Sequence, residues 1–416
     1  MSDVLDRFVK YCSVTSQSDP LTSEHVPSTP TQHEMARVVA DDLRALGAED
    51  VCVDEHAYVT AQWPASEGCE ALPHLCLCAH LDTAWQTKGE NVHPHVVHYD
   101  GGRLVMGTVD GEEIYCDTTT NPELDRMKGW DIVVSDGTTL IGGDDKAGVA
   151  EIVALLARYR NDPSIPHPAL AVAFVPDEEI GHGAALLDLD ALGCEWGYTL
   201  DGGPLGEFSY ECFNAAEANV RARGISVHTG TAKGIMVNAS EAIMRFHQLL
   251  PAAERPEYTE GYDGFFYLER MSGDCESAQA DYIIRDHDKA LFNRRKRLIE
   301  RACEQVNEEL GDTYLSVEIH DTYQNMADVI LDGNEHLVEN ARRAFEECGH
   351  EMKIIPMRGG TDGAQLCYRG LPCPNISAGY YNAHGVREFV PVPELEGMVD
   401  VLQALMNLYA HPQNEQ

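Results

Sequence analysis

The chain has 416 residues, 44% of them hydrophobic, and its 69 acidic residues against 30 lysines and arginines give a net charge of −39. The length exceeds the usual size of one core, so two domains are expected. The acidic balance argues against nucleic acid as a partner, because phosphate binding depends on lysine and arginine, and it disfavours anionic membrane surfaces. The charge suits either a well-solvated surface or a host adapted to salt or acid.

Nothing in the sequence indicates a membrane span or a secretion signal. No apolar run approaches the roughly 18 residues of a spanning helix, and the N-terminus carries acids where a signal peptide carries basic residues. The 13 cysteines are scattered without a CxxC pair, and Cys76 and Cys78 share one face of a predicted strand. We therefore expect a soluble, cytoplasmic protein with reduced cysteines that pack in the core.

The first half of the chain alternates helix and strand patterns. A helix is predicted over 31–46, ending before Gly47, and is followed by strands at 51–53 and 75–79. Residues 85–140 are rich in Gly, Asp and Thr and indicate loops and hairpins. A helix at 148–159 and a strand at 169–175 follow, which is typical of an α/β domain with a largely buried sheet.

The middle of the chain differs from both ends. Strand patterns at 219–225 and 280–284 accompany helices at 237–250 and 290–310, whereas the chain after residue 325 returns to alternating elements. We predict an α/β domain formed by residues 1–210 and 325–416. A smaller α+β domain, residues 211–324, is inserted into it.

Two adjacent glutamates stand at the end of the predicted strand 169–175. Neighbouring residues on one element point in different directions, so Glu178 and Glu179 can do different work. A carboxylate that binds a metal is ionised and engaged, while a free one can take up and release a proton. The pair suggests one metal ligand and one general acid/base.

Four further motifs carry acids or histidines. His80 and Asp82 follow the strand at 75–79, Asp144 enters the helix at 148–159, Asp201 ends a predicted strand at 196–201, and His384 lies in a loop. Each has an ordinary alternative when taken singly: a surface pair, a helix N-cap, a turn or a plain loop histidine. Together they form the ligand set that a two-metal hydrolase requires.

The order of these motifs and the residues in each of them resemble those of a known superfamily. The motifs are HxD at 80–82, GxDDKAG at 142–148, PDEE at 176–179, DGG at 201–203 and NxHG at 382–385. They resemble the dinuclear zinc hydrolases of the aminopeptidase–carboxypeptidase superfamily, and more closely its bacterial tripeptide aminopeptidases. The closer likeness extends over nearly the whole chain, through residues 26–29, 89–92, 230–238, 282–285, 358–365 and 370–375.

The resemblance implies a role for each residue of the set. One zinc ion would be held by His80 and Asp201 and the other by Glu179 and His384, with Asp144 bridging the two. Glu178 would be the general acid/base and Asp82 would orient His80, while the peptide bond Asp144–Asp145 would be cis. The fold would be a mixed-sheet zinc-peptidase domain flanked by helices, its insert serving as a lid or dimerisation domain. A homodimer is therefore one expected state.

The implied reaction is hydrolysis of the first peptide bond of a tripeptide. His228 would help to stabilise the oxyanion, although Thr229 replaces the proline that relatives usually carry beside it. Because arginine forms bidentate pairs with carboxylates, Arg285 and Arg358 are candidates for binding the free C-terminus of the peptide. Ordinary salt bridges are the alternative for both arginines.

Two other kinds of function stay open at this stage. The same metal core would serve a dipeptidase, a carboxypeptidase or an N-acyl amino acid deacylase, because specificity depends on the surrounding loops. A non-catalytic binding or assembly module could also use the fold. The complete ligand set and Glu178 argue against the second possibility.

Overall fold

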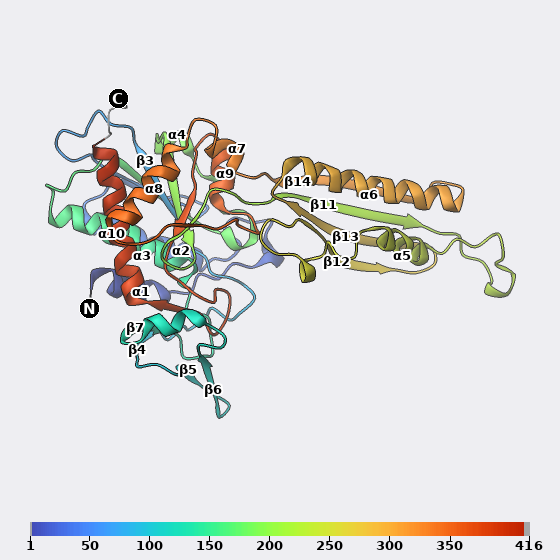
Figure 1. The fold of residues 1–416 in the computed structure, drawn as a ribbon, viewed down its shortest axis with the longest axis horizontal. Helices are drawn as coiled ribbons and strands as arrows, with labels where there is room; N and C mark the ends of the chain where they lie inside the picture. Colours follow the sequence, from blue (N-terminus) through green and yellow to red (C-terminus); the bar gives the residue numbers. More distant parts are fainter. Residues whose placement is uncertain (1, 412–416) are drawn as a thin grey trace. The chain divides into compact units, whose positions relative to one another are not determined.

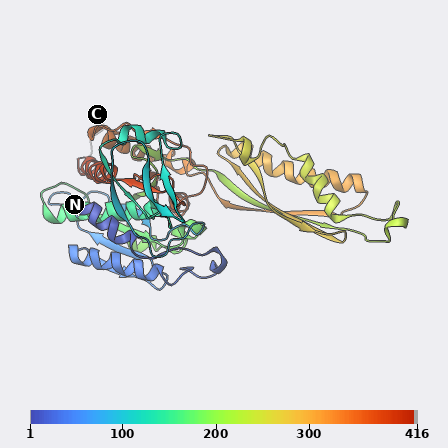
Figure 2. The same ribbon diagram turned by 90° about the horizontal axis from the view of Figure 1, so that it is seen from below.

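The structure is a computed structural model that describes residues 2–411, and these divide into two compact units. Unit 1 comprises residues up to Tyr210 together with Asp328–Ile355 and the chain from Thr361 onward. Unit 2 comprises Glu211–Ala327 and Pro356–Gly360. Figures 1 and 2 show the elements of each unit from two directions.

The core of unit 1 is an eight-stranded mixed sheet in the order β1-β2-β8-β3-β9-β16-β10-β15. Strand β3 lies between β8 and β9 and is parallel to both, and β9 is parallel to β16. The strands are β1 (Glu49–Val53), β2 (Val59–Trp63), β3 (Leu75–His80), β8 (Leu170–Val175), β9 (Trp196–Gly202), β10 (Glu207–Ser209), β15 (Lys353–Ile354) and β16 (Asn375–Ser377). Every residue of β3 and β8 is buried, so these strands are continuous apolar runs in the sequence.

Helices cover both faces of this sheet (Figure 1). The longer ones are α1 (Asp3–Cys12), α2 (Gln32–Leu46), α3 (Gly143–Asn161), α8 (His336–Glu347) and α10 (Val392–Ala410). Helix α3 packs on β3 and β9, and α10 packs on α3 and α8. Cys76 and Cys78 face a cluster formed with α4 (Leu189–Leu192) and α9 (Asp362–Tyr368), which confirms their predicted place in the core. All thirteen cysteines are free.

Smaller sheets form where loops and hairpins were predicted. β4 (His95–Tyr99), β7 (Trp130–Val134) and β17 (Phe389–Pro391) make a three-stranded antiparallel sheet, and β5 (Leu104–Val109) pairs with β6 (Glu112–Cys116). Strand β17 belongs to the late segment of the chain that also carries His384. Its pairing with β7 therefore anchors that segment close to the entrance of α3, beside which β17 packs.

Unit 2 is a four-stranded antiparallel sheet with two helices on one face (Figure 2). The order β12-β13-β11-β14 joins β12 (Phe265–Gly273), β13 (Ser277–Asp286), β11 (Asn214–Arg223) and β14 (Leu315–Tyr323). Alternate residues of the two central strands pack against α5 (Ala239–Leu249) and α6 (Lys289–Leu310). The predicted strands at 219–225 and 280–284 correspond to β11 and β13. Their true bounds are longer because both strands are paired along their whole length.

The short helix α7 (Ala327–Ile330) spans the point where the chain passes from unit 2 back to unit 1. Within residues 2–411, no helix is both long enough and apolar enough to cross a membrane.

Candidate active site

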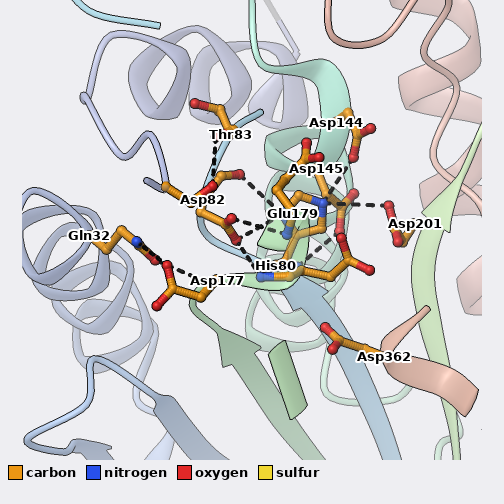
Figure 3. Close-up of polar contacts among 12 residues, drawn as sticks. Gln32, His80, Asp82, Thr83, Asp144, Asp145, Asp177, Glu179, Asp201 and Asp362 are labelled. Atoms are coloured by element: carbon orange, nitrogen blue, oxygen red, sulfur yellow. Dashed lines mark hydrogen bonds and ion pairs between the residues drawn. The ribbon is translucent and has the colours of Figure 1, made fainter. Parts of the chain in front are cut away.

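The topology of unit 1 brings the predicted acids and histidines to one edge of its sheet. His80 ends β3, Glu178 and Glu179 follow β8, and Asp201 lies at the end of β9. Because these three strands are adjacent and parallel, their carboxyl ends meet at the same edge. Asp144 reaches this edge from the start of α3. Figure 3 shows the labelled carboxylates gathered around His80.

Asp144 lies between two histidines. Its Oδ1 is 2.9 Å from His80 Nε2, and its Oδ2 is 3.1 Å from His384 Nε2. His80 Nε2 is also 3.6 Å from Asp201 Oδ1, and His384 Nε2 is 3.0 Å from Glu179 Oε2. Each oxygen of one carboxylate thus faces a different imidazole, and each imidazole faces a second carboxylate. The peptide bond Asp144–Asp145 is cis, as the resemblance implies.

Asp82 contacts both halves of the site. His80 Nδ1 is 3.3 Å from Asp82 Oδ1 and 3.1 Å from the Asp82 carbonyl oxygen. Asp82 therefore holds the His80 ring at Nδ1, while Nε2 on the other side of the ring faces Asp144. The Asp82 carboxylate also accepts the backbone N–H groups of Glu178, at 3.0 Å, and of Glu179, at 3.2 Å. One fully buried carboxylate therefore positions the histidine and the pair of glutamates together.

The pKa values of the site residues are shifted because several carboxyl groups lie close together away from water. Burial raises the pKa of Glu178 well above its usual value, that of Glu179 to about 7 and that of Asp201 to about 6. Hydrogen bonds to Asp144 and Glu179 raise the pKa of His384 to about 10. Burial opposes ionisation of Asp144, but hydrogen bonds from both histidines prevail and lower its pKa.

The donor set fits divalent cations. Ligand atoms of His80, Asp144 and Glu179 lie within 4.8 Å of one another, and so do those of His80, Asp145 and Asp201. Three carboxylates, those of Asp144, Glu179 and Asp201, face the imidazoles of His80 and His384, and Glu179 Oε1 is buried without a hydrogen-bond partner. A buried anionic oxygen without a partner is costly unless a cation neutralises it.

Asp145 is a weaker candidate ligand than its neighbour. Its Oδ2 accepts the N–H of His80 at 3.1 Å, and its Oδ1 accepts the N–H of Gly148 at 3.2 Å. Both oxygens are therefore engaged by the backbone, whereas those of Asp144 face imidazole nitrogens. Asp144 is the better placed of the two to bind metal.

Several residues that sequence reasoning missed hold the predicted ligands in place. Glu388 is buried and accepts the N–H groups of Ile141, Gly142 and Asp144 at 3.0, 2.8 and 3.0 Å. Asn375 accepts the N–H of Asp201 and donates to its carbonyl, both at 3.0 Å. The Tyr380 hydroxyl lies 3.1 Å from the same carbonyl. The only sequence signal for Glu388 was an acid four residues after His384, and Tyr380 offered none. Asn375 ends a segment that resembles the family, but nothing in that segment indicated its contact with Asp201.

The three predicted substrate-binding residues belong to unit 2. His228 is exposed, and its Nδ1 accepts the N–H of Gly230 at 3.1 Å. The Arg285 guanidinium lies 5.0 Å from the centre of the Tyr323 ring and donates to the neighbouring carbonyl of Ile284.

Arg358 differs from Arg285 in the number of its contacts. Its guanidinium donates to the carbonyls of Thr259, Gly261 and Asp263 and to the Thr259 hydroxyl, and it stacks on Phe213. Most of its donors are therefore used within the loop 259–263. In this conformation Arg285 is the freer of the two arginines.

Comparison with known proteins identifies the family. Residues 117–408 match the model of peptidase family M20/M25/M40, and the chain belongs to that family. The chain is 45% identical to peptidase T of Parabacteroides distasonis, covering 98% of this chain and 99% of that protein. It is 44% identical to peptidase T of Shouchella clausii, covering 98% of each. The family that the motifs indicate is confirmed, and the protein is a hydrolase.

Solved structures give the same fold. The aminopeptidase PepT of Bacillus cereus superposes with a TM-score of 0.76 at 23% identity, covering 98% of each chain. A tripeptidase of Staphylococcus aureus superposes with a TM-score of 0.77 at 20% identity, again covering 98% of each. The predicted α/β fold with a mixed sheet is confirmed.

Proposed function

We propose that the protein is an aminopeptidase that releases the N-terminal residue from unblocked tripeptides with the help of two divalent metal ions. The observation that carries this proposal is the position of Asp144, with one oxygen facing His80 and the other facing His384. The likeness to two peptidase T proteins over nearly their full length, and to the Staphylococcus aureus tripeptidase in fold, supports the choice of substrate.

The residues divide into two sets of ligands that share Asp144. His80 and Asp201 would hold one ion, and Glu179 and His384 the other. Imidazole and carboxylate ligands suit zinc best, although cobalt or manganese would also be accepted by such a site. When bound, the ions would polarise the scissile carbonyl and make a water molecule more acidic.

Glu178 is the residue that moves the proton. It would accept a proton from the attacking water and deliver it to the nitrogen of the departing amine. A carboxyl group can perform both steps near neutral pH when its pKa is raised, and burial raises that of Glu178. Asp82 would keep this group in register with His80, because its carboxylate accepts the backbone N–H of Glu178 and also contacts the His80 ring at Nδ1.

The roles of His228, Arg285 and Arg358 in substrate binding stay predictions, as does the use of the inserted domain as a lid or dimerisation surface. Contacts with the oxyanion and with the C-terminal carboxylate are what these residue types can supply. The free donors of Arg285 make it the stronger of the two carboxylate-binding candidates.

The proposal is tested with three substrates of one sequence: a free tripeptide, its N-acetylated form and the dipeptide that lacks the last residue. Zinc-loaded enzyme should release the first residue rapidly from the free tripeptide only. Equal cleavage of the dipeptide would favour a dipeptidase, and loss of the acetyl group would favour an N-acyl amino acid deacylase. Release of the last residue would favour a carboxypeptidase.

A further inference from the structure

The backbone is strained at the residue before the proposed general acid/base. Strand β8 ends at Val175, and Asp177 then adopts a φ of +55°, in the left-handed region. Residues with a Cβ rarely adopt this conformation, and it persists only when the surroundings hold it. The turn that follows, Glu178–Ile180, carries the two catalytic-site glutamates. The conformation of Asp177 therefore sets the direction from which Glu178 enters the site.

Two residues near the start of α2 hold Asp177 in this conformation. Its carboxylate accepts the Ser28 N–H at 2.6 Å and the Ser28 hydroxyl at 2.5 Å. It also accepts a hydrogen bond from Gln32 Nε2 at 2.6 Å, while Gln32 Oε1 accepts one from the backbone N–H of Asp177 at 3.0 Å. The Gln32 amide thus binds both the side chain and the main chain of one residue (Figure 3). We call Ser28, Gln32 and Asp177 the Gln32 clamp.

The clamp completes a row of fixed peptide groups. Three successive backbone N–H groups bind side-chain acceptors: that of Asp177 binds Gln32, and those of Glu178 and Glu179 bind Asp82. Gln32 and Asp177 are fully buried, and Ser28 is 7% exposed. A turn held at three consecutive N–H groups has little freedom to rotate, so the Cα–Cβ bond of Glu178 has a fixed direction.

Asp177 itself is unsuited to the chemistry. Both of its oxygens accept hydrogen bonds from Ser28 or Gln32, so neither is free to bind a metal or to exchange a proton with substrate. Its contribution must act through Glu178. Ser28 and Gln32 likewise act through Asp177, because each forms hydrogen bonds with it.

We propose that the Gln32 clamp is a positioning device that orients Glu178 for proton transfer and so sets the rate of the chemical step. This inference rests on the proposed function, because it takes Glu178 as the general acid/base. The clamp touches neither substrate nor metal in this scheme. Loosening it should lower kcat, leave KM nearly unchanged and leave two metal ions bound per chain.

A swap of amide and carboxylate tests the clamp directly. Gln32→Glu puts a second carboxylate beside Asp177, and Asp177→Asn leaves two amide groups facing each other. Each single variant should lower kcat by about 100-fold, the size of effect that misplacing a catalytic group by about 1 Å produces. The double variant Gln32→Glu with Asp177→Asn restores a carboxylate–amide pair with the partners exchanged. It should recover most of the lost kcat.

Controls separate positioning from folding. Gln62 lies on β2 and donates to the backbone carbonyls of Ala191 and Leu192 in α4, not to any member of the Gln32 clamp, so Gln62→Met should keep wild-type kcat. Tm and zinc stoichiometry are measured for every variant, and kcat is measured at a temperature well below the lowest Tm. Ser28→Ala, which removes one hydroxyl only, replaces any single variant that fails to fold and should still lower kcat.

The outcomes distinguish the clamp from the proposed function. Glu178→Gln is assayed in the same series and should lose turnover. If Glu178→Gln loses turnover while folded clamp variants with two bound metals keep wild-type kcat, the proposed role of the clamp is refuted and the proposed function stands. The same holds if kcat falls in the single variants and the double variant recovers nothing. If Glu178→Gln keeps wild-type turnover, the assigned acid/base is wrong and the clamp inference fails with it.

Discussion

Glu388 provides the sharpest test of how Asp144, the proposed bridging ligand, is held in place. Its Oε2 accepts the N–H groups of Ile141 and Gly142, and its Oε1 accepts that of Asp144. In Glu388→Gln the amide oxygen can keep the first pair of bonds, but the amide nitrogen then faces the N–H of Asp144. The Asp144 N–H loses its acceptor and the amide N–H that faces it is also unpaired. The other two bonds lose the charge assistance that the ionised carboxylate gives above the pKa of Glu388, which burial raises to about 7.

The expected cost follows from these three bonds. An unsatisfied buried N–H costs about 1–3 kcal/mol, and bonds to a charged group are roughly twice as strong as neutral ones. We expect Glu388→Gln to lower the free energy of unfolding by about 2–3 kcal/mol. Glu388→Ala, which strands all three donors and leaves a cavity, should cost about 4–6 kcal/mol on the same basis. The affinity for zinc should fall about 10–100-fold, as is typical when a residue supporting a metal ligand is lost.

Urea unfolding measures the free energy of unfolding, and competition with a chelating dye measures the affinity for zinc. The exposed Glu347, changed to Gln, is the matched control and should alter neither quantity. Stability and zinc affinity equal to wild type in both Glu388 variants would refute the idea that this carboxylate holds Asp144. A stability loss without any change in zinc affinity would limit its role to the fold.

Further predictions concern the other buried groups. Glu178→Gln should lower kcat by about 10²–10⁴-fold while two zinc ions stay bound, and loss of zinc from this variant would mark Glu178 as a ligand instead. Glu151 is buried with neither oxygen hydrogen-bonded, and burial raises its pKa well above the usual value. Its protonated form is therefore favoured by folding, and its contribution to stability is complete below about pH 4.5 and is lost as the pH rises. Glu151→Gln should consequently make the protein more stable than wild type at about pH 8 but not at about pH 4.5. Urea unfolding at both pH values checks this, and an equal difference at the two would contradict it. Arg285→Ala should raise KM for tripeptides with little change in Tm. Arg358→Ala should lower Tm, because its guanidinium binds three carbonyls of the loop 259–263. An unchanged KM in both arginine variants would remove both from substrate binding.

The strands that build the site were predictable because they are buried on both faces. β3 and β8 are unbroken apolar runs, and the acids that follow them stand out against that background. The end of α2 was equally clear, because Gly47 takes a φ of +90° that favours glycine. Where apolar runs, helix caps and charged motifs coincide, the local sequence closely predicts where a site residue lies on its strand or helix.

The edge strands of unit 2 carried no such signal. β12 and β14 pair on one side only, and most of their residues are partly or fully exposed, so their patterns resemble those of loops. Strands β11 and β13, which alternate buried and exposed residues, were found.

The supporting residues of the site could not be predicted for a different reason. Glu388 contacts residues about 245 positions earlier in the chain, and Gln32 contacts Asp177 across 145 positions. Asn375 binds Asp201 across 174 positions. Contacts of this kind depend on strand order and helix packing, which no local pattern encodes. Motifs supplied the candidate ligands, and the fold supplied the residues that hold them.

The bridging of two metal ions by Asp144 is the central claim, and anomalous diffraction from crystals of the zinc-loaded protein tests it most directly. We expect two zinc peaks per chain, one beside His80 and Asp201 and one beside Glu179 and His384, with an Asp144 oxygen on each. A single peak, or a pair of peaks in which Asp144 contacts only one ion, would contradict the claim.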